Sequence, residues 1–137
     1  MLRANLSLVG LVVGLAAARA AAETPADLLR RYAAAARSEG PDAPAFSAAR
    51  GEQFFRSTHG GAWSCATCHT QAPAAPGSHT VTRKPIAPLA PAANPERFTN
   101  FLKAEKWFDR NCSDVLQRPC TAHEKGDVLT YLLSLGR

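Results

Sequence analysis

The sequence predicts an all-α fold interrupted by one long loop, on three observations. Four segments carry apolar side chains at helical spacing, and each begins near a residue that commonly caps helices. Residues 71–94 contain five prolines, which remove backbone donors and exclude a helix there. Between these parts lies the motif Cys65-Ala66-Thr67-Cys68-His69, which indicates what the helices enclose.

This motif has the Cys-x-x-Cys-His pattern of covalent haem attachment. Two thiols one helical turn apart can add to the two vinyl groups of a haem, and the next residue reaches the iron. Cys65 and Cys68 are therefore the expected thioether anchors, and His69 is the expected proximal ligand. A redox dithiol would lack the histidine, and a zinc site would need a second ligand pair. We expect helices packed around one covalently attached haem c.

The first 22 residues have the features of a secretory signal peptide. Arg3 precedes an apolar run from Leu6 to Ala18, and small residues follow this run. The run is shorter than the ~20 residues that a membrane span needs. We expect residues 1–22 to be a signal peptide and residues 23–137 to form a single monohaem cytochrome c domain. The mature protein is then periplasmic and not an integral membrane protein.

The charge of the chain gives no support for nucleic-acid binding. The sequence has 16 Lys and Arg against 11 Asp and Glu, a net charge of +5, and the basic residues are scattered. A solvated surface accounts for this surplus. A face that docks an acidic redox partner is the alternative.

Two helices are expected before the haem motif. Thr24-Pro25 predicts an N-cap and a first helical proline, opening a helix to about Arg37. Residues 38–44 form a linker, and Ser47 caps a second helix through Phe55.

Gly51 and Phe55 share one face of this second helix, because they are one turn apart. An ordinary core face with an incidental glycine would explain the pair. A close helix crossing would also explain the pair, because glycine lets two backbones approach. The pattern resembles the crossing of the first and last core helices in class I cytochromes c, and Tyr131 is then the expected aromatic partner.

The proline-rich segment 71–94 is expected to be an ordered, extended loop that wraps the proximal side of the haem. A metal-bound histidine usually donates its second ring N–H to a carbonyl, which fixes the ring orientation. Proline carbonyls of this loop can accept that bond from His69, and Pro88 is the candidate by resemblance to class I cytochromes c.

Two helices are expected after the loop. The first runs from Asn100 to Arg110, and Thr121 with Glu124 forms a capping box that opens the last helix, which stops at Gly136. In the helix from Asn100, the expected apolar residues are Phe98, Phe101, Leu102, Trp107 and Phe108, and the outward basic residues are Lys103, Lys106 and Arg110.

Cys112 and Cys120 lie outside the haem motif, and neither has the spacing of a second one. In an exported protein two spare cysteines most often pair. Their closed loop of about nine residues would stabilise the fold by roughly 2 to 3 kcal/mol.

The sixth ligand of the iron cannot be a methionine of the mature chain, because Met1 is the only methionine. An electron carrier of class I uses a methionine in this position. The remaining candidates are a lysine, an open site, or one of four residues. His59 precedes His69 too closely to reach the opposite face easily, His79 lies in the proximal loop, and His123 is expected to be solvent-exposed. The fourth is Asn111.

Asn111 follows the predicted helix, where asparagine is normally a C-terminal cap. Its amide oxygen is a weak, hard donor that suits ferric iron better than ferrous iron. Such a ligand would hold the oxidised state and dissociate on reduction, which would leave a site for a diatomic gas.

Several motifs resemble the SHP class of oxygen-binding monohaem cytochromes c, and the resemblance covers essentially the whole mature chain. The triplet Arg110-Asn111-Cys112, with Cys120 nearby, is much more specific than the haem motif. The other matching stretches are Lys84 to Pro91, Arg97-Phe98-Thr99, Glu105-Lys106-Trp107, Cys120-Thr121, Glu124-Lys125 and Asp127-Val128-Leu129.

The resemblance implies a class I cytochrome c-like fold in which Asn111 ligates the oxidised haem and dissociates on reduction. It also implies a disulfide between Cys112 and Cys120, binding of O2 and NO by the reduced protein, and a multihaem or membrane cytochrome as electron donor. The sequence departs from the family between Gln71 and His79, which is rich in alanine and proline, and this difference bears on haem exposure.

Two other function classes remain open from the sequence. A plain electron carrier would complete its iron site with one of the three other histidines and would stay low-spin in both oxidation states. An enzyme, such as a peroxidase or a nitric oxide dioxygenase, would need a distal acid-base group and a positive charge over the iron. Arg110 beside Asn111 gives little support, because neighbours on a helix diverge.

Overall fold

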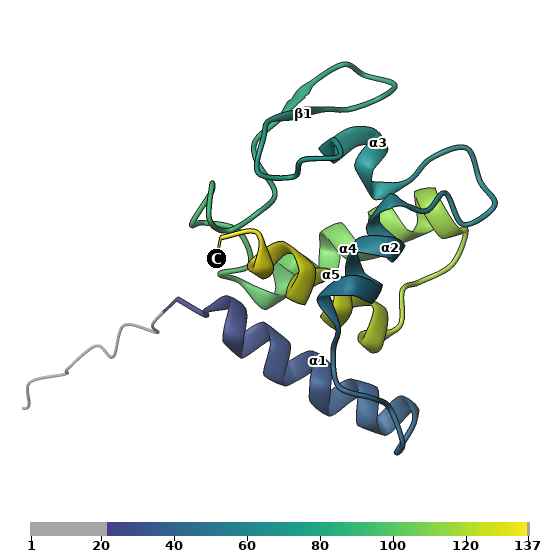
Figure 1. Cartoon of the computed structure of the whole chain (residues 1–137), viewed down its shortest axis with the longest axis vertical. Coiled ribbons are helices and arrows are strands. Elements are labelled where there is room, and N and C mark those ends of the chain that lie inside the picture. Colours follow the sequence, from purple (N-terminus) through teal and green to yellow (C-terminus); the bar gives the residue numbers. More distant parts are fainter. Residues whose placement is uncertain (1–21, 137) are drawn as a thin grey trace, which may run out of the picture.

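The computed structural model describes residues 22–136 and confirms the all-α prediction. Its N-terminal helix lies across the base of the molecule in Figure 1, and the haem motif lies near the top. The predicted signal peptide lies outside the described residues, except for Ala22. Within the described part no helix is long and apolar enough to cross a membrane. The elements are α1 (Pro25–Glu39), α2 (Ala48–Arg56), α3 (Cys65–His69), β1 (Gly77–Ser78), β2 (Pro85–Ile86), α4 (Phe101–Leu116) and α5 (Ala122–Ser134).

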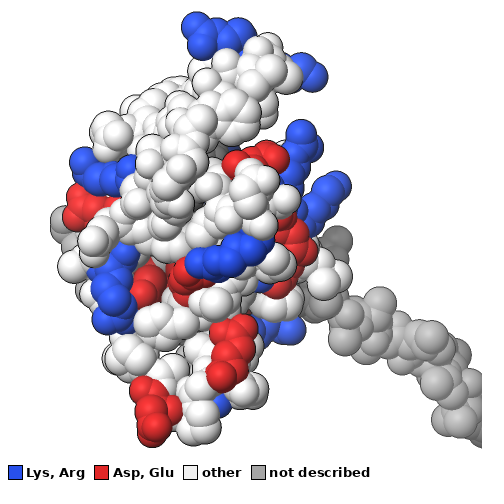
Figure 2. All heavy atoms as spheres, turned by 90° about the vertical axis from the view of Figure 1, so that its right-hand side faces the viewer, with Lys and Arg blue, Asp and Glu red and all other residues white. Residues whose placement is uncertain are grey.

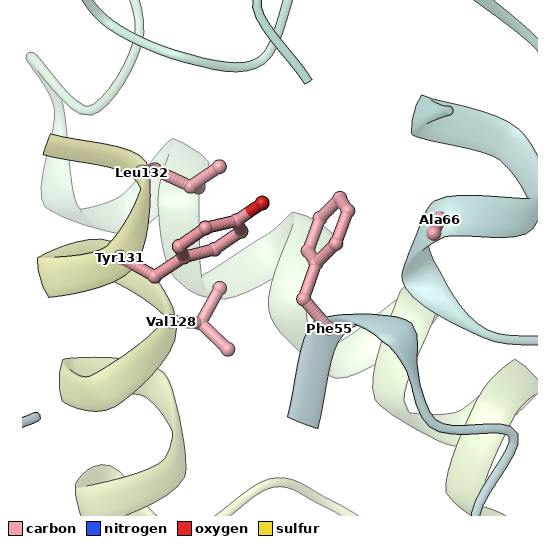
Figure 3. Close-up of a cluster of buried hydrophobic side chains, with 5 residues drawn as sticks. All are labelled: Phe55, Ala66, Val128, Tyr131 and Leu132. Atoms are coloured by element: carbon pink, nitrogen blue, oxygen red, sulfur yellow. The ribbon is translucent and has the colours of Figure 1, made fainter. Parts of the chain in front are cut away.

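The crossing of α2 over α5 forms the centre of the fold, which decides between the two interpretations of Gly51 in favour of a close crossing. Gly51 is buried there, and a Cβ at its position would overlap the carbonyl group of Asp127 and lie 2.9 Å from Cβ of Tyr131. The rings of Phe55 and Tyr131 lie with their centroids 5.6 Å apart. Figure 3 shows them facing each other between the two helices. Glycine therefore permits a backbone contact that brings one aromatic ring from each helix to the same cluster.

The α1 helix packs along α5 on the side away from the haem motif (Figure 1). The predicted N-cap is confirmed, because Thr24 and Asp27 form a capping box. Leu28 and Tyr32 are buried in one cluster with Leu129. The helix ends at Glu39, two residues beyond the expected Arg37, and Gly40 follows as its C-cap.

The proline-rich loop contains a small hairpin that the sequence did not predict. Strands β1 and β2 pair antiparallel, with Gly77 opposite Ile86 and Ser78 opposite Pro85. Each strand has two residues, too few to show an alternating pattern in the sequence. The hairpin projects from the body beside α3, and basic side chains stand at the top of Figure 2, where the rest of the surface is largely uncharged.

The α4 helix is longer than predicted, since it starts after the N-cap Asn100 and continues to Leu116. Asn111 therefore lies inside the helix and is not its C-cap, which is Gln117 in the left-handed conformation. The reason is packing, because Cys112 and Val115 extend the buried face beyond Arg110.

The apolar face assigned to α4 was partly wrong. Leu102 is 78% exposed and Trp107 is 46% exposed. The buried face instead follows the spacing of Ala104, Phe108 and Cys112, and both misassigned residues lie one or two positions off this stripe. The three basic residues of this helix are exposed, as expected.

Candidate haem site

The haem motif forms its own short helix, α3, which a capping box fixes at its start. Ser64 is buried, and its side chain accepts a hydrogen bond from the backbone N–H of Thr67 at 3.2 Å. The Thr67 hydroxyl accepts one from the backbone N–H of Ser64 at 2.9 Å. After His69 the chain leaves the helix at Thr70, whose φ is 62°. Because the capping box sets the first turn, Cys65 and Cys68 lie one turn apart, as covalent attachment requires.

Burial shifts the pKa values of two residues of the haem motif. It raises the pKa of the Cys65 thiol to about 11. It lowers the pKa of His69 to about 4, and the positive charge of Arg97 adds to this lowering. His69 is therefore a neutral imidazole at pH 7, which is the form that binds iron.

The side chains around α3 fit a haem. Cys65 packs against a buried cluster that contains Phe55, Ala66 and Tyr131, and we call it the haem cluster. Figure 3 shows this cluster between α2, α3 and α5. A porphyrin needs apolar walls of this kind, and two thiols followed by an imidazole are the donors of haem c. Three other segments add partly buried residues to the same cluster: Leu89, Phe98 and Phe108.

A site for a bare metal ion is not formed by the described residues. No group of three or more His, Cys, Asp and Glu side chains converges within residues 22–136. The zinc alternative for Cys65 and Cys68 therefore gains no second ligand pair from this part of the chain.

The proline-rich loop lies against α3, and its expected place on the proximal side of the haem stays a prediction. A Cβ on Gly77 would overlap the carbonyl oxygen of Cys68, so the β1 strand lies directly against the haem helix. The backbone N–H of Thr80 lies 3.4 Å from Sγ of Cys68. Leu89 and Ala90 both donate backbone hydrogen bonds to the carbonyl of Pro73, which ties the end of the loop to its start.

Arg97 holds the second half of this loop. Its Nε donates to the Pro88 carbonyl at 2.9 Å, and its Nη2 donates to the Ala87 carbonyl at 2.8 Å. The Pro88 carbonyl also accepts from Nδ2 of Asn94 at 3.3 Å. The expected bond from His69 to this carbonyl stays a prediction. Arg97 belongs to one of the stretches that resemble the SHP class, but nothing in the sequence indicated that its side chain holds the carbonyl groups of this loop.

Asn111 lies at the edge of the inner face of α4. It is half-buried, three residues after Phe108 and four before the buried Val115. Residues at this spacing share a helix face, so Asn111 is on the side of α4 that carries Phe108 into the haem cluster. Within residues 22–136, the side-chain hydrogen bonds made by α4 and its caps involve other residues and leave the Asn111 amide free.

Each of the three other histidines has a hydrogen-bond partner in the structure. Nε2 of His59 lies 2.9 Å from the Phe54 carbonyl, and Nδ1 of His79 accepts backbone hydrogen bonds within the hairpin. His123 was expected to be solvent-exposed, but its side chain is only 22% exposed. Its Nε2 lies 3.0 Å from the Pro44 carbonyl, because the linker before α2 folds over the start of α5.

Cys112 and Cys120 are paired in the structure, with their Cα atoms 5.6 Å apart. Cys112 is on α4, one residue after Asn111, and Cys120 precedes the N-cap of α5. The pair therefore joins the end of α4 to the start of α5, and Cys65 and Cys68 take no part in it.

Two polar networks near the site were not found from the sequence. The buried Asp127 accepts from Nε of Arg50 at 2.8 Å and from the backbone N–H of Ser47 at 2.7 Å, which locks α2 onto α5. The buried Lys125 donates to Glu105 at 2.8 Å. The burial of Lys125 could have been inferred from its position in the apolar stripe of α5, four residues before Leu129.

Comparison with known proteins identifies the relatives of this chain. A family described as "Domain of unknown function (DUF1924)" matches residues 41–132. The chain is 46% identical over 113 residues to the cytochrome c-type protein SHP of Cereibacter sphaeroides, covering 80% of this chain and 82% of SHP. It is 39% identical over 111 residues to cytochrome c'' of Methylophilus methylotrophus, covering 78% of this chain and 77% of that protein.

Solved structures agree with the fold. The structure of oxidised SHP, described as an oxygen binding cytochrome c, is 42% identical with a TM-score of 0.73, covering 82% of this chain and 98% of that one. Oxidised cytochrome c'' of Methylophilus methylotrophus is 39% identical with a TM-score of 0.71, covering 80% and 93%. The fold and the capped Cys-x-x-Cys-His helix define a monohaem cytochrome c that carries one covalently bound haem c. Within that class, the chain belongs to the SHP family of cytochromes c.

Proposed function

We propose that this protein is an exported cytochrome whose reduced form binds diatomic gases. In this proposal Cys65 and Cys68 hold the haem, His69 is the proximal ligand, and Asn111 is a sixth ligand of the oxidised state only. When bound, the haem supplies an iron that takes O2 or NO as a ligand. The observation that carries the proposal is the free Asn111 amide on the haem-facing edge of α4, one turn beyond Phe108.

The surroundings of Asn111 support its role as a releasable ligand. Its side chain has no competing hydrogen bond within the described residues, so it can turn toward the iron or away from it without breaking one. The backbone beside it is tied through Cys112, which limits how far α4 itself can move. The histidines give less support to a plain electron carrier, because each has the local partners described above.

The relatives support the same proposal. One is described as an oxygen binding cytochrome c. The solution structure of cytochrome c'', 38% identical with a TM-score of 0.71 and covering 82% of this chain and 94% of that one, is described as giving insight into haem-ligand detachment. We propose that this chain also releases a ligand, that it is periplasmic after loss of residues 1–22, and that a multihaem or membrane cytochrome donates its electrons.

The test is a set of visible spectra of the purified holoprotein, oxidised, reduced without oxygen, and reduced with carbon monoxide. Asn111→Ala is compared with Ser113→Ala, an exposed change two residues along the same helix. We expect the reduced wild type to be high-spin and to bind carbon monoxide at once. Asn111→Ala should alter only the oxidised spectrum, and Ser113→Ala should alter none.

Two results would contradict the proposal. A low-spin reduced protein that ignores carbon monoxide would be an electron carrier with a different sixth ligand. An oxidised spectrum that is the same in Asn111→Ala and wild type would remove Asn111 from the iron. Mass spectrometry of the exported protein tests the signal peptide, which we expect to end at residue 22.

A further inference from the structure

The α4 helix, which carries Asn111, is tied to its neighbours at three levels along its length, twice by hydrogen bonds and once by a disulfide. At its start, the backbone N–H of Phe101 donates to the carboxylate of Glu23 at 2.6 Å. In its middle, Glu105 accepts hydrogen bonds from other helices. At its end, Cys112 is paired with Cys120. The position of α4 therefore depends on a few specific contacts in addition to apolar packing.

The middle contact joins three helices through one carboxylate. Oε1 of Glu105 accepts from the hydroxyl of Tyr32 on α1 at 2.9 Å, and Oε2 accepts from Nζ of Lys125 on α5 at 2.8 Å. Tyr32 is 2% exposed and Lys125 is 8% exposed. Burial and the bond to Glu105 raise the pKa of Tyr32, which keeps the phenol protonated as a donor. A hydrogen bond to a buried charged group is stronger than an exposed neutral one. We call Tyr32, Glu105 and Lys125 the α4 brace.

The α4 brace contacts the haem cluster through Phe108. The ring of Tyr32 meets that of Phe108 edge to face, with centroids 6.0 Å apart. Nζ of Lys125 lies 6.0 Å from the centre of the same ring. Phe108 packs against the cluster that also holds Cys65. Asn111 follows Phe108 by three residues, so any shift of α4 that moves Phe108 also moves the amide.

We propose that the α4 brace positions Asn111 and so determines how firmly the amide holds the sixth coordination position of the oxidised haem. This inference rests on the proposed ligand role of Asn111. Tyr32, Glu105 and Lys125 are positioning residues, because they touch the ligand only through α4. Loss of one brace contact should loosen α4, weaken the amide ligand, and let an external ligand replace it more easily.

The test is the affinity of the oxidised holoprotein for imidazole, which must displace the sixth ligand. Tyr32→Phe removes the hydroxyl and keeps the ring against Phe108, and Lys125→Met removes the second donor. The matched control is Glu39→Gln, which lies on α1 like Tyr32. Glu39 accepts hydrogen bonds from the backbone N–H of Ala122 on α5 and makes none to α4. Urea unfolding of every variant measures the accompanying loss of stability.

We expect Tyr32→Phe and Lys125→Met each to raise the imidazole affinity by about five- to tenfold, the effect of losing one hydrogen bond of ordinary strength. Glu39→Gln should leave the affinity within about twofold of wild type while lowering stability by a similar amount. The spectrum of the reduced protein should be the same in all variants, since the amide is not bound there.

A purely structural brace would give a different result. If Tyr32→Phe and Glu39→Gln lose the same stability and both keep the wild-type imidazole affinity, while Asn111→Ala raises it strongly, the positioning role is wrong and the ligand role stands. If Asn111→Ala itself leaves the affinity unchanged, the ligand role is wrong and the positioning role falls with it.

Discussion

Gly51 of α2 and Tyr131 of α5 meet so closely that a methyl group at residue 51 would lie 2.9 Å from Cβ of the tyrosine and would overlap the backbone of Asp127. The obstacle is largely backbone, which cannot move aside as a flexible side chain can. The position of Tyr131 in the haem cluster thus depends on the absence of a side chain one helix away.

We expect Gly51→Ala to lower the free energy of unfolding by about 3 kcal/mol, because the added carbon overpacks the crossing. Urea unfolding of the holoprotein measures this loss. Gly40→Ala is the control, since nothing lies within 4 Å of a Cβ at residue 40 and its φ is −160°. Equal stabilities for the two variants would show that the crossing can open without cost.

Replacing Cys112 and Cys120 together by serine should destabilise the protein by about 2 to 3 kcal/mol, because the closed loop no longer restricts the unfolded chain. Urea unfolding measures the difference. Alkylation without reductant, followed by mass spectrometry, checks the pairing. Uptake of label on these two cysteines of the wild-type holoprotein would contradict it.

Arg97→Gln should lower the reduction potential of the haem by on the order of tens of millivolts, because it removes a half-buried positive charge near His69. Spectroelectrochemical titration gives the potential. Arg97→Lys is the matched control, since it keeps the charge and loses one of the two carbonyl contacts. A potential that falls equally in both variants would assign the effect to loop geometry and not to charge.

Glu124→Gln should destabilise the protein by about 1 kcal/mol at pH 7, because it weakens the capping box of α5. Burial alone would raise the pKa of Glu124, but the hydrogen bonds from Arg118 and Thr121 outweigh it and hold the pKa below its ordinary 4.5. This stabilisation is complete above the unfolded pKa and is lost as the pH falls through the folded one.

The difference between Glu124→Gln and wild type should therefore shrink steadily below about pH 4.5. Thermal unfolding between pH 3 and 7 follows the trend, and Asp42→Asn, an exposed change, is its control. A difference that grows in acid would reverse the sign and contradict a lowered pKa.

Local signals in the sequence predicted much of the fold. Caps at Thr24, Ser47 and Thr121 placed the starts of three helices correctly, because each cap depends on residues within one turn. The fourth helix was expected from Asn100, which is its N-cap. The crossing at Gly51 could be suggested from the sequence because a glycine one helical turn from an aromatic residue is typical of two helices that pack closely.

Other features depended on contacts between distant segments. The end of α4 was placed too early, because the packing of Cys112 and Val115 sustains the helix beyond its last strongly amphipathic turn. Glu105 is an ordinary helix-surface residue in sequence, and the position of Lys125 in the apolar stripe of α5 does not name its partner, because only the approach of α1 and α5 to α4 brings the three brace residues together. Whether Asn111 binds iron stays a prediction.

The ion pair between Arg50 and Asp127 joins residues that are 77 positions apart, and the haem motif lies within the span that it closes. Closing so long a loop has a large entropic cost and gains little until α5 is present to dock. Cys65 packs against a cluster to which α5 contributes Val128, Tyr131 and Leu132, so part of the cover of this thiol arrives with the last helix. The anchoring of the haem and the docking of the C-terminal helix therefore share one apolar cluster.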